Sequence, residues 1–206
     1  MKVLLVNGSP HKDGCTYTAL HEIAKTLKKN GIEYEIFHLG TKPIAQCIAC
    51  GKCRQTGKCV FNDAVNIIGA RLEEFDGIVL GSPVYYGGPA SQICSFCDRL
   101  FFTKANKMAG KLGAAVVSCR RGGATASFDR LNKYFGITNM LVVGSQYWNM
   151  VHGFTPSDVR KDKEGLQTMR TLGQNMAWLL KCIALGKKHG INEPKYEPIT
   201  LTHFID

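Results

Sequence analysis

The stretch that decides the fold is residues 3–16, which read VLLVNGSPHKDGCT. Four apolar residues come first and stop at Asn7, which predicts a short buried strand. A loop of small and polar residues follows. From residue 16 to residue 29 the apolar side chains recur every three or four positions, which is the spacing of one helix face. This part of the chain therefore predicts a strand, a loop and a helix.

The same alternation continues along the rest of the chain. Further strands are predicted at residues 34–37, 77–81, 113–117 and 140–143. Further helices are predicted at residues 67–75, 93–102, 128–135 and 166–183. Strands that are apolar almost throughout are buried on both faces, and helices between them make the strands parallel. The pattern predicts an α/β fold of the doubly wound class with a five-stranded parallel sheet.

Length and patterning also bear on the domain organisation. A chain of 206 residues can bury a sizeable core, and we find no internal repeat or linker, so residues 1–206 are expected to form one domain. Two segments lie outside the alternation. Residues 40–62 form an irregular insert after the second strand, and residues 187–206 form a tail without clear periodicity.

Charge and cysteine usage narrow the class of protein. The 26 basic residues outnumber the 16 acidic ones, for a net charge of +10, but they form no basic block, so we expect no nucleic acid partner. The opening apolar run is too short for a signal peptide, and Lys181 interrupts the last apolar stretch, so we expect no membrane span. Nine cysteines without an export signal are typical of a reducing compartment, and we expect the cytoplasm.

Three loops, at residues 8–16, 81–89 and 118–124, follow the first, third and fourth predicted strands. In a sheet of order 2-1-3-4-5, the chain reverses between strands one and three, and ligands bind there, at the carboxyl ends. The first loop offers hydroxyls and a helix N-terminus for a phosphate. The second offers proline and tyrosine surfaces for a flat ring, and the third offers arginines and backbone N–H groups. Together the loops predict an FMN site.

The candidate FMN contacts come from all three loops. In the first loop they are Ser9, His11, Lys12, Gly14, Cys15 and Thr16, in the second Ser82, Pro83, Val84, Tyr85, Tyr86 and Gly87, and in the third Ser118, Arg120, Arg121, Gly122 and Gly123. The first loop lacks the G-x-G-x-x-G fingerprint, which disfavours NAD as the resident ligand. For each loop alone, a plain turn is the alternative. No side chain is expected to be catalytic, because the flavin N5 carries the chemistry.

These motifs resemble the NADPH-dependent FMN reductases of flavodoxin-like fold, and among them the iron-sulfur flavoprotein branch. The resemblance rests on Gly8-Ser9-Pro10 with Gly14 and Thr16, on residues 81–85 (GSPVY), on residues 120–123 (RRGG) and on the cysteine set described next, and it covers residues 1 to about 187. It implies that Ser9, Lys12 and Thr16 bind the FMN phosphate, that residues 83–87 line the isoalloxazine, and that residues 118–123 border its pyrimidine edge. It also implies a homodimer or homotetramer. Cys15 stands where the family more often has Asn or Ser.

Four cysteines lie close together in the insert, at Cys47, Cys50, Cys53 and Cys59. The compact spacing resembles that of ferredoxin ligands and predicts a [4Fe–4S] cluster. Zinc is less natural here, since zinc ligands usually come as two separated pairs. A cysteine-bearing active-site lid without metal is the alternative that the spacing leaves open.

The function predicted from these features is an FMN-dependent oxidoreductase that takes electrons from NADH or NADPH and passes them to a small-molecule or protein acceptor. A flavin-only quinone, azo or nitro reductase without a cluster is one alternative. A flavodoxin-type electron carrier is another, although such carriers are typically acidic. A zinc-stapled module that binds nucleic acid is a third.

Overall fold

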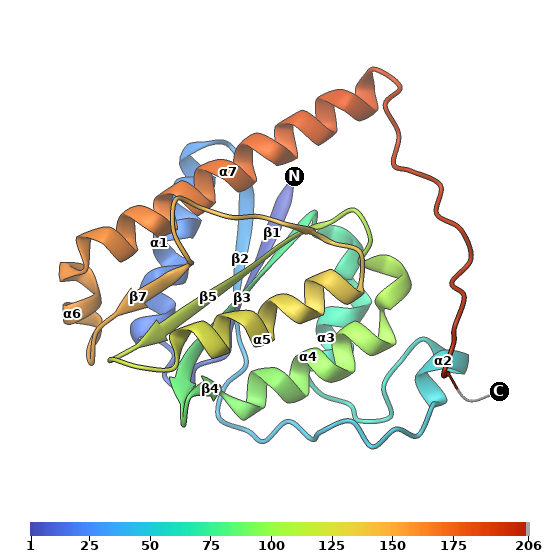
Figure 1. The fold of residues 1–206 in the computed structure, drawn as a ribbon, viewed down its shortest axis with the longest axis horizontal. Coiled ribbons are helices and arrows are strands. Elements are labelled where there is room, and N and C mark those ends of the chain that lie inside the picture. Colours follow the sequence, from blue (N-terminus) through green and yellow to red (C-terminus); the bar gives the residue numbers. More distant parts are fainter. Residues whose placement is uncertain (205–206) are drawn as a thin grey trace.

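A computed structural model gives the structure of residues 1–204. Its strands and helices alternate along the chain (Figure 1). The strands are β1 (Lys2–Asn7), β2 (Glu33–His38), β3 (Gly77–Tyr85), β4 (Gly88–Pro89), β5 (Leu112–Cys119), β6 (Leu141–Val142) and β7 (Met150–His152). The α-helices are α1 (Cys15–Lys29), α2 (Lys52–Thr56), α3 (Ala64–Arg71), α4 (Ser91–Thr103), α5 (Ala124–Ile137), α6 (Pro156–Lys161) and α7 (Lys163–Lys188). Two 3-10 turns, Leu72–Glu74 and Ala105–Lys107, follow α3 and α4.

The sheet has the order β2-β1-β3-β5-β6, and these strands pair in parallel. This confirms the predicted strand order. Strand β7 also pairs in parallel with β5, so two short strands share the fifth position. The chain reverses direction across the sheet between β1 and β3, and the carboxyl ends of both strands meet at one edge.

Helices cover both faces of the sheet, as Figure 1 shows. Leu4 and Val6 of β1 pack into one apolar cluster with α3, α4 and α5, whereas Val3 and Leu5 pack into the other cluster with α1 and α7. All four side chains are fully buried. Because successive strand residues point to opposite faces, a strand covered on both sides must be apolar throughout. This is why the opening run VLLV identified the fold.

Two of the predicted elements differ from the structure. Strand β3 extends to Tyr85 and forms a hairpin with β4, so residues 81–89 are not the open loop that we predicted. The predicted fifth strand at 140–143 is reduced to β6, because the chain bulges out before it pairs again as β7. β6 forms the edge of the sheet, which leaves Leu141 and Val142 half-exposed.

Two short helices were missed. The α6 helix begins at a capping box, in which the Thr155 hydroxyl accepts from the Asp158 N–H and the Asp158 carboxylate accepts from the Thr155 N–H. That signal was visible in the sequence. The α2 helix lies inside the cysteine insert and is only five residues long, too short to show periodicity.

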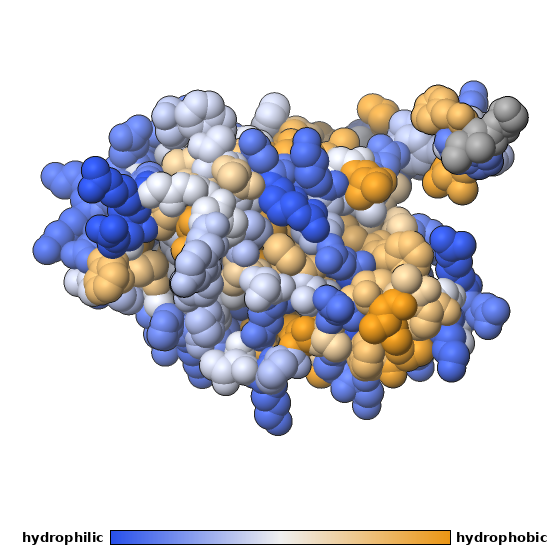
Figure 2. Space-filling model, turned by 60° about the horizontal axis from the view of Figure 1, so that its bottom comes forward, coloured by the Kyte–Doolittle hydropathy of each residue, from blue (hydrophilic) through white to orange (hydrophobic). Residues whose placement is uncertain are grey.

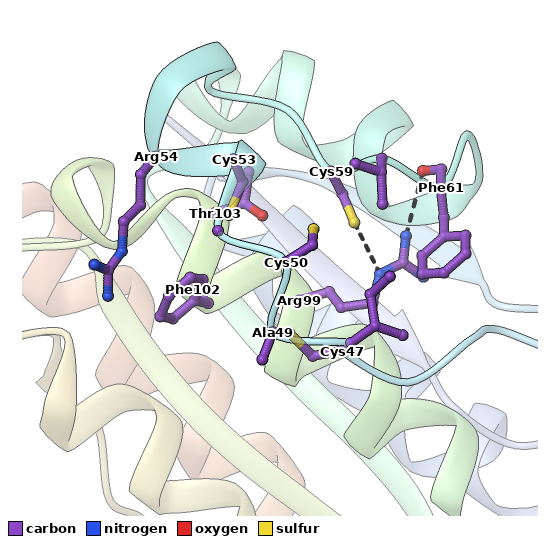
Figure 3. Close-up of a pocket in the computed structure, with 13 residues that line it drawn as sticks. Cys47, Ala49, Cys50, Cys53, Arg54, Cys59, Phe61, Arg99, Phe102 and Thr103 are labelled. Carbon is purple, nitrogen blue, oxygen red and sulfur yellow. Dashed lines mark hydrogen bonds between the residues drawn. The ribbon is translucent and has the colours of Figure 1, made fainter.

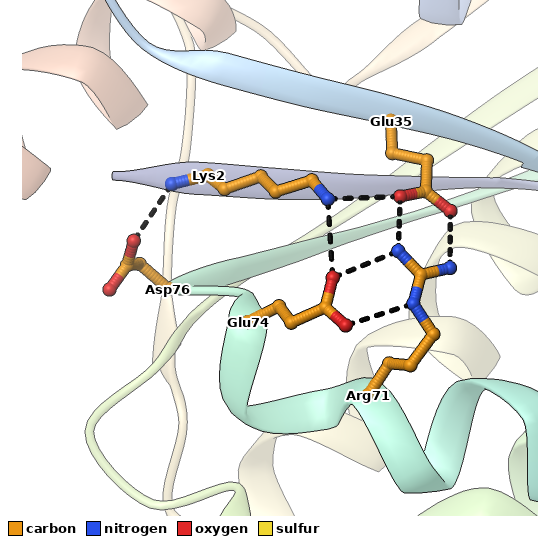
Figure 4. Close-up of polar contacts among 5 residues, drawn as sticks. All are labelled: Lys2, Glu35, Arg71, Glu74 and Asp76. Atoms are coloured by element: carbon orange, nitrogen blue, oxygen red, sulfur yellow. Dashed lines mark hydrogen bonds and ion pairs between the residues drawn. The ribbon is translucent and has the colours of Figure 1, made fainter.

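On the side of the sheet where the parallel strands begin, a charged network ties α3 to β1 and β2 (Figure 4). Arg71 donates two hydrogen bonds to Glu35, at 2.9 and 2.7 Å, and also contacts Glu74. Lys2 contacts the same two carboxylates. The guanidinium of Arg71 lowers the pKa of Glu35 to about 2. The network lies at the edge of the sheet opposite the predicted ligand site.

The predicted tail began at residue 187, but α7 runs to Lys188. The described part of the tail after α7 has no regular secondary structure, and residues 205–206 of the predicted tail lie outside the described residues. Within residues 1–204, no helix combines the length and the apolar character needed to cross a bilayer.

Candidate functional site

The loop between β1 and α1 is held by a buried asparagine. Asn7 accepts a hydrogen bond from the Ser9 N–H at 3.1 Å and donates one to the Lys12 carbonyl at 3.0 Å. The Ser9 hydroxyl in turn accepts from the His11 N–H at 3.1 Å. From the neighbouring strand, His38 Nε2 lies 2.8 Å from the Ser9 carbonyl oxygen. The loop is therefore fixed from inside the protein, which leaves its outer side free to bind a ligand.

The N-terminus of α1 has no internal cap. Its N-cap residue is Gly14, which supplies no side-chain hydrogen bond, and the first turn contains no acidic residue. A Cβ at Gly14 would lie 2.9 Å from the Cβ of His11, so only glycine fits. Free N–H groups and the positive end of the helix dipole favour an anion here. This chemistry suits the FMN phosphate.

The three predicted loops meet at one cavity. It has a volume of about 400 Å³, within the usual range for small-molecule sites. Its lining contains nine of the predicted FMN residues, namely Ser9, His11, Cys15, Thr16, Pro83, Val84, Tyr85, Ser118 and Arg120. The hydroxyls of Thr16 and Ser118 lie 2.8 Å apart across the gap between α1 and β5. The cavity thus brings together hydroxyls, a proline and a tyrosine from the three loops.

The remaining predicted FMN residues do not line this cavity. They are Lys12, Gly14, Ser82, Tyr86, Gly87, Arg121, Gly122 and Gly123. Ser82 is buried, where its hydroxyl donates to the Pro83 carbonyl at 2.8 Å and accepts from the Ala90 N–H at 2.9 Å. The bond from Ala90 ties β3 to the start of α4.

The hairpin turn and the third loop touch each other. Tyr86 and Gly87 both have positive φ, 49° and 76°, as a two-residue hairpin turn of the primed type requires. Gly123 also has positive φ, 88°, and a Cβ there would lie 2.7 Å from the Gly87 Cα. The absence of side chains at these glycines brings the second and third loops together beside the cavity.

The thiol of Cys15, a predicted FMN contact, forms a hydrogen bond within the protein. Its thiol donates to the Gly153 carbonyl at 3.9 Å, across to the segment after β7. Burial raises the pKa of Cys15, and the Asp158 carboxylate raises it further. The neutral thiol therefore does not repel an anion at the start of α1.

The arginines of the third loop are exposed, and only Arg120 lines the cavity. Sequence reasoning missed Gly153 and Phe154, which line it from the segment after β7, and Asn7 and His38, which fix the first loop. The carboxyl-edge rule could have found the last two, because both residues end parallel strands beside the ligand site.

The four cysteines of the insert line a second cavity, shown in Figure 3, with a volume of about 310 Å³. Three residues from the end of α4 close its floor, namely Arg99, Phe102 and Thr103. Cys47 and Cys50 are exposed, whereas Cys53 and Cys59 are half-buried. All four are free thiols. The insert thus brings all four thiols to the lining of one cavity.

The donor set suits an iron-sulfur cluster in chemistry but is not preassembled. The cavity lining carries four thiols and no carboxylate, which suits a cluster bound through thiolates. In residues 1–204, however, no three His, Cys, Asp or Glu side chains are close enough together to hold a metal ion as they stand. Ligation would draw the thiols inward. Because no residue from 40 to 62 is buried, the segment has few packing contacts to oppose that movement.

The cations around this cavity are of two kinds. Arg99 is buried and forms an ion pair with Asp63. Burial disfavours its charge, yet hydrogen bonds to Asp63 and Cys59 outweigh burial and raise the pKa of Arg99. Lys52, Arg54 and Lys58 are exposed instead, with Arg54 5.5 Å from the centre of the Phe102 ring.

Comparison with known proteins supports the same interpretation. A family model described as NADPH-dependent FMN reductase matches residues 1–155. An iron-sulfur flavoprotein of Methanocaldococcus jannaschii is 36% identical over 193 residues, which cover 89% of this chain and 99% of that protein. An iron-sulfur flavoprotein of Methanosarcina thermophila is 28% identical, over 89% of this chain and 97% of its own.

Solved structures show the fold. An NAD(P)H:quinone oxidoreductase from Methanothermobacter marburgensis superposes with a TM-score of 0.65 at 15% identity, covering 85% of this chain and 98% of its own. A flavodoxin from the domain Archaea has a TM-score of 0.61 at 16% identity, covering 88% of this chain and 99% of its own. The fold is therefore flavodoxin-like, as predicted.

Proposed function

The chain belongs to the NADPH-dependent FMN reductase family, with iron-sulfur flavoproteins among its relatives, and on that premise we propose that this FMN-dependent oxidoreductase takes electrons from NADH or NADPH and delivers them through a [4Fe–4S] cluster. The observation that carries the proposal is the single cavity into which the loops after β1, β3 and β5 converge. Bound FMN supplies a ring that accepts a hydride and passes electrons on singly.

The chain's own residues would bind and orient this cofactor. The hydroxyls of Ser9 and Thr16, with the free N–H groups of α1, would hold the phosphate. Pro83, Val84 and Tyr85 would present a flat apolar wall to the ring. Since the hairpin and the third loop are locked together, this wall has a fixed position before the ligand arrives.

Arg120 would lie beside the ring's pyrimidine edge, where its positive charge favours a reduced, more negative ring. The remaining predicted contacts, on residues 86–87 and 121–123, stay part of the proposal through their backbone. They follow Tyr85 and Arg120, which line the cavity, on the two loops that touch at Gly87 and Gly123.

At the second cavity, Cys47, Cys50, Cys53 and Cys59 would be the ligands of the cluster. The chain's basic character fits an enzyme with an anionic cofactor and an anionic nicotinamide donor. We further propose one domain over residues 1–206, a cytoplasmic location, a homodimer or homotetramer, and a small-molecule or protein acceptor.

The second candidate is a flavin-only reductase of quinones, azo or nitro compounds. It is favoured by the exposure of Cys47 and Cys50 and by the spacing of the four thiols, of which no three in residues 1–204 are close enough together to hold a metal ion as they stand. The flavodoxin-type carrier is disfavoured by the net charge of +10.

The test is anaerobic purification followed by analysis of flavin, iron and acid-labile sulfide. We expect FMN, equal amounts of iron and sulfide, and bleaching of the visible bands by NADH or NADPH. FMN with full NAD(P)H oxidation but no iron after anaerobic reconstitution would leave the flavin-only reductase. Colourless protein, or protein that releases FAD alone, would overturn the FMN assignment.

A further inference from the structure

Arg99 is the largest fully buried side chain of the described residues, with only 1% of its surface exposed. Arginine is almost never buried to this degree unless its charge is paired, because taking a guanidinium out of water is costly. The side chain extends from α4 toward the cysteine insert, and Figure 3 shows it beside Cys59. A role in organising that insert would account for its burial.

The guanidinium uses all three of its nitrogens. Nη1 and Nη2 donate to the two carboxylate oxygens of Asp63, at 2.6 and 3.0 Å. Nη1 also donates to the Ala45 carbonyl at 3.1 Å, and Nη2 to the Phe61 carbonyl at 3.3 Å. One side chain thereby joins the beginning of the insert, before the first cysteine, to its end, after the last cysteine.

The remaining N–H points at sulfur. Nε of Arg99 lies 3.1 Å from the Sγ of Cys59 and donates to it. Cys59 is one of the four proposed cluster ligands. Its own position is fixed further by Asn66, which accepts from the Cys59 N–H at 2.9 Å and donates to the Cys59 carbonyl at 2.8 Å. Cys59 is thus held from its backbone and from its sulfur before any metal binds.

We propose that Arg99 is a positioning residue for the iron-sulfur cluster, which fixes the Cys59 thiolate by an Nε–H···S hydrogen bond and makes the cluster easier to reduce. This inference rests on the proposed function, because it requires the cluster. Hydrogen bonds to ligand sulfurs and nearby charge are among the features that set cluster potentials. Reduction adds negative charge, so a fixed cation stabilises the reduced state more than the oxidised one.

The other cations beside the cavity do not have this geometry. Arg54 is exposed and lies over the Phe102 ring, where water and salt screen its charge. Lys104 donates to the Gly57 carbonyl at 2.8 Å and acts on the backbone of the insert, not on a thiol. Arg99 is distinguished by burial and by a donor aimed at a ligand atom. A guanidinium cannot lose its proton at any ordinary pH, so the donor is permanent.

The first test is an anaerobic redox titration of the cluster in the full protein, with FMN, iron and sulfide measured on each preparation. Arg99→Lys keeps the positive charge but loses the planar guanidinium with its several N–H donors, and Arg99→Gln loses the charge. We expect both variants to lower the one-electron reduction equilibrium constant, Arg99→Gln by at least tenfold, which is a shift of 59 mV to more negative potential. The matched control Arg54→Gln should change it by less than threefold.

Asp63→Asn separates the contact with sulfur from the support of the insert. Asparagine can still cap α3 and accept from Arg99, but the negative charge is gone. We expect the cluster to be retained with a potential equal to or higher than that of the wild type. If both Arg99 variants fold with FMN but bind no iron, a cluster retained in Asp63→Asn supports the proposal, and a cluster lost there as well overturns it.

A second measurement needs no change at Arg99. With 15N-arginine in the Arg54→Gln protein, pulsed EPR of the reduced cluster should detect a 15N coupling through the hydrogen bond. Absence of the coupling would overturn the proposal, even if the Arg99 variants do not fold.

Arg99 variants with full iron at the wild-type potential would overturn it as well, and so would an Arg54→Gln shift as large as theirs. Wild-type protein without iron after reconstitution would contradict the proposed cluster, whereas a wild-type cluster with unchanged variants contradicts only the role of Arg99.

Discussion

The cavity proposed for FMN and the cysteine cavity are built in different ways. The cavity proposed for FMN lies where parallel strands end, and three of its hydroxyl-bearing residues, Ser9, Thr16 and Ser118, are buried. The cysteine cavity lies on an insert in which no residue from 40 to 62 is buried. In the first, the sheet itself places the residues. In the second, side chains from α4 hold a loop that has no core of its own.

The low burial of the insert is visible on the surface, since Figure 2 shows hydrophobic residues gathered over the cysteine insert and α4. Ile48, Val60 and Phe102, which all line the cysteine cavity, are exposed by 57%, 44% and 49%. A segment with so little burial depends on a few side chains that hydrogen-bond to it from outside, among them Arg99, Lys104 and Asn66. The comparison predicts that the two cavities fail independently of one another, and four experiments test this.

The largest effect is expected from Cys50→Ser. Loss of one of four thiolate ligands should remove most or all of the iron and sulfide, because the loop cannot replace the missing ligand. FMN content should remain at the wild-type level, since no residue lines both cavities. The matched control is Cys182→Ser, an exposed cysteine on α7, which should leave both cofactors unchanged. Equal loss of FMN and iron in Cys50→Ser would show that the sites are coupled.

The next largest effect is expected from the double variant Ser9→Ala with Thr16→Ala. A hydrogen bond to a charged group contributes ~1.5–3 kcal/mol, so losing two phosphate contacts should weaken FMN binding at least about 100-fold. Iron content should stay at the wild-type level. The measurement is the flavin dissociation constant, with Thr18→Ala as the control, because the Thr18 hydroxyl donates to the Gly14 carbonyl. An unchanged constant in the double variant would place the phosphate elsewhere.

The predictability of the two cavities from the sequence differs for the same reason. Val3 to Val6 must be apolar on both faces, so the strand, the class of fold and the carboxyl-edge site follow from local pattern. The cysteine spacing likewise identified the second cavity. The burial of Arg99 and its contact with Cys59 could not be predicted, because nothing in the sequence around Arg99 marks it as buried. Its partner Asp63 lies 36 residues away, and only the packing of α4 against the insert brings the two together.

The hairpin was mispredicted for another physical reason. Residues 81–85 contain a glycine and a proline, which usually end a strand, but Ser82 and Pro83 pair in register with Val117 and Ser118 of β5. Pairing with β5, which continues past the end of β1, keeps residues 82 and 83 in the strand although their own propensity is to end it.

A third test concerns the contact between the hairpin turn and the third loop, beside the cavity proposed for FMN. Gly123→Ala places a Cβ 2.7 Å from the Gly87 Cα in a backbone conformation that alanine avoids. Overpacking and the positive φ together should cost about 2 kcal/mol of stability and weaken FMN binding, because the hairpin must move away. Gly122→Ala is the matched control, since a Cβ there meets no atom within 4 Å. Thermal unfolding and flavin titration check both variants, and identical behaviour of the two would mean that the loops do not need this contact.

The smallest effect is expected at the opposite edge of the sheet, where neither cavity lies. Arg71 first, and Lys2 second, lower the pKa of Glu35 to about 2, from about 4.3 in an unfolded chain. A carboxylate whose pKa is lowered by folding adds stability above the unfolded pKa, and this contribution disappears as the pH falls through the folded pKa. Glu35→Gln should therefore destabilise the protein at pH 7, and its difference from the wild type should fade between about pH 4.3 and pH 2. The side chain is 27% exposed, so solvent screening limits the loss at pH 7 to about 1 kcal/mol.

The control for Glu35→Gln is Glu33→Gln, which is exposed on the same strand. Denaturant unfolding at each pH should show the loss without any change in iron or FMN content. A selective loss of either cofactor in Glu35→Gln would show that this edge of the sheet acts on a distant site.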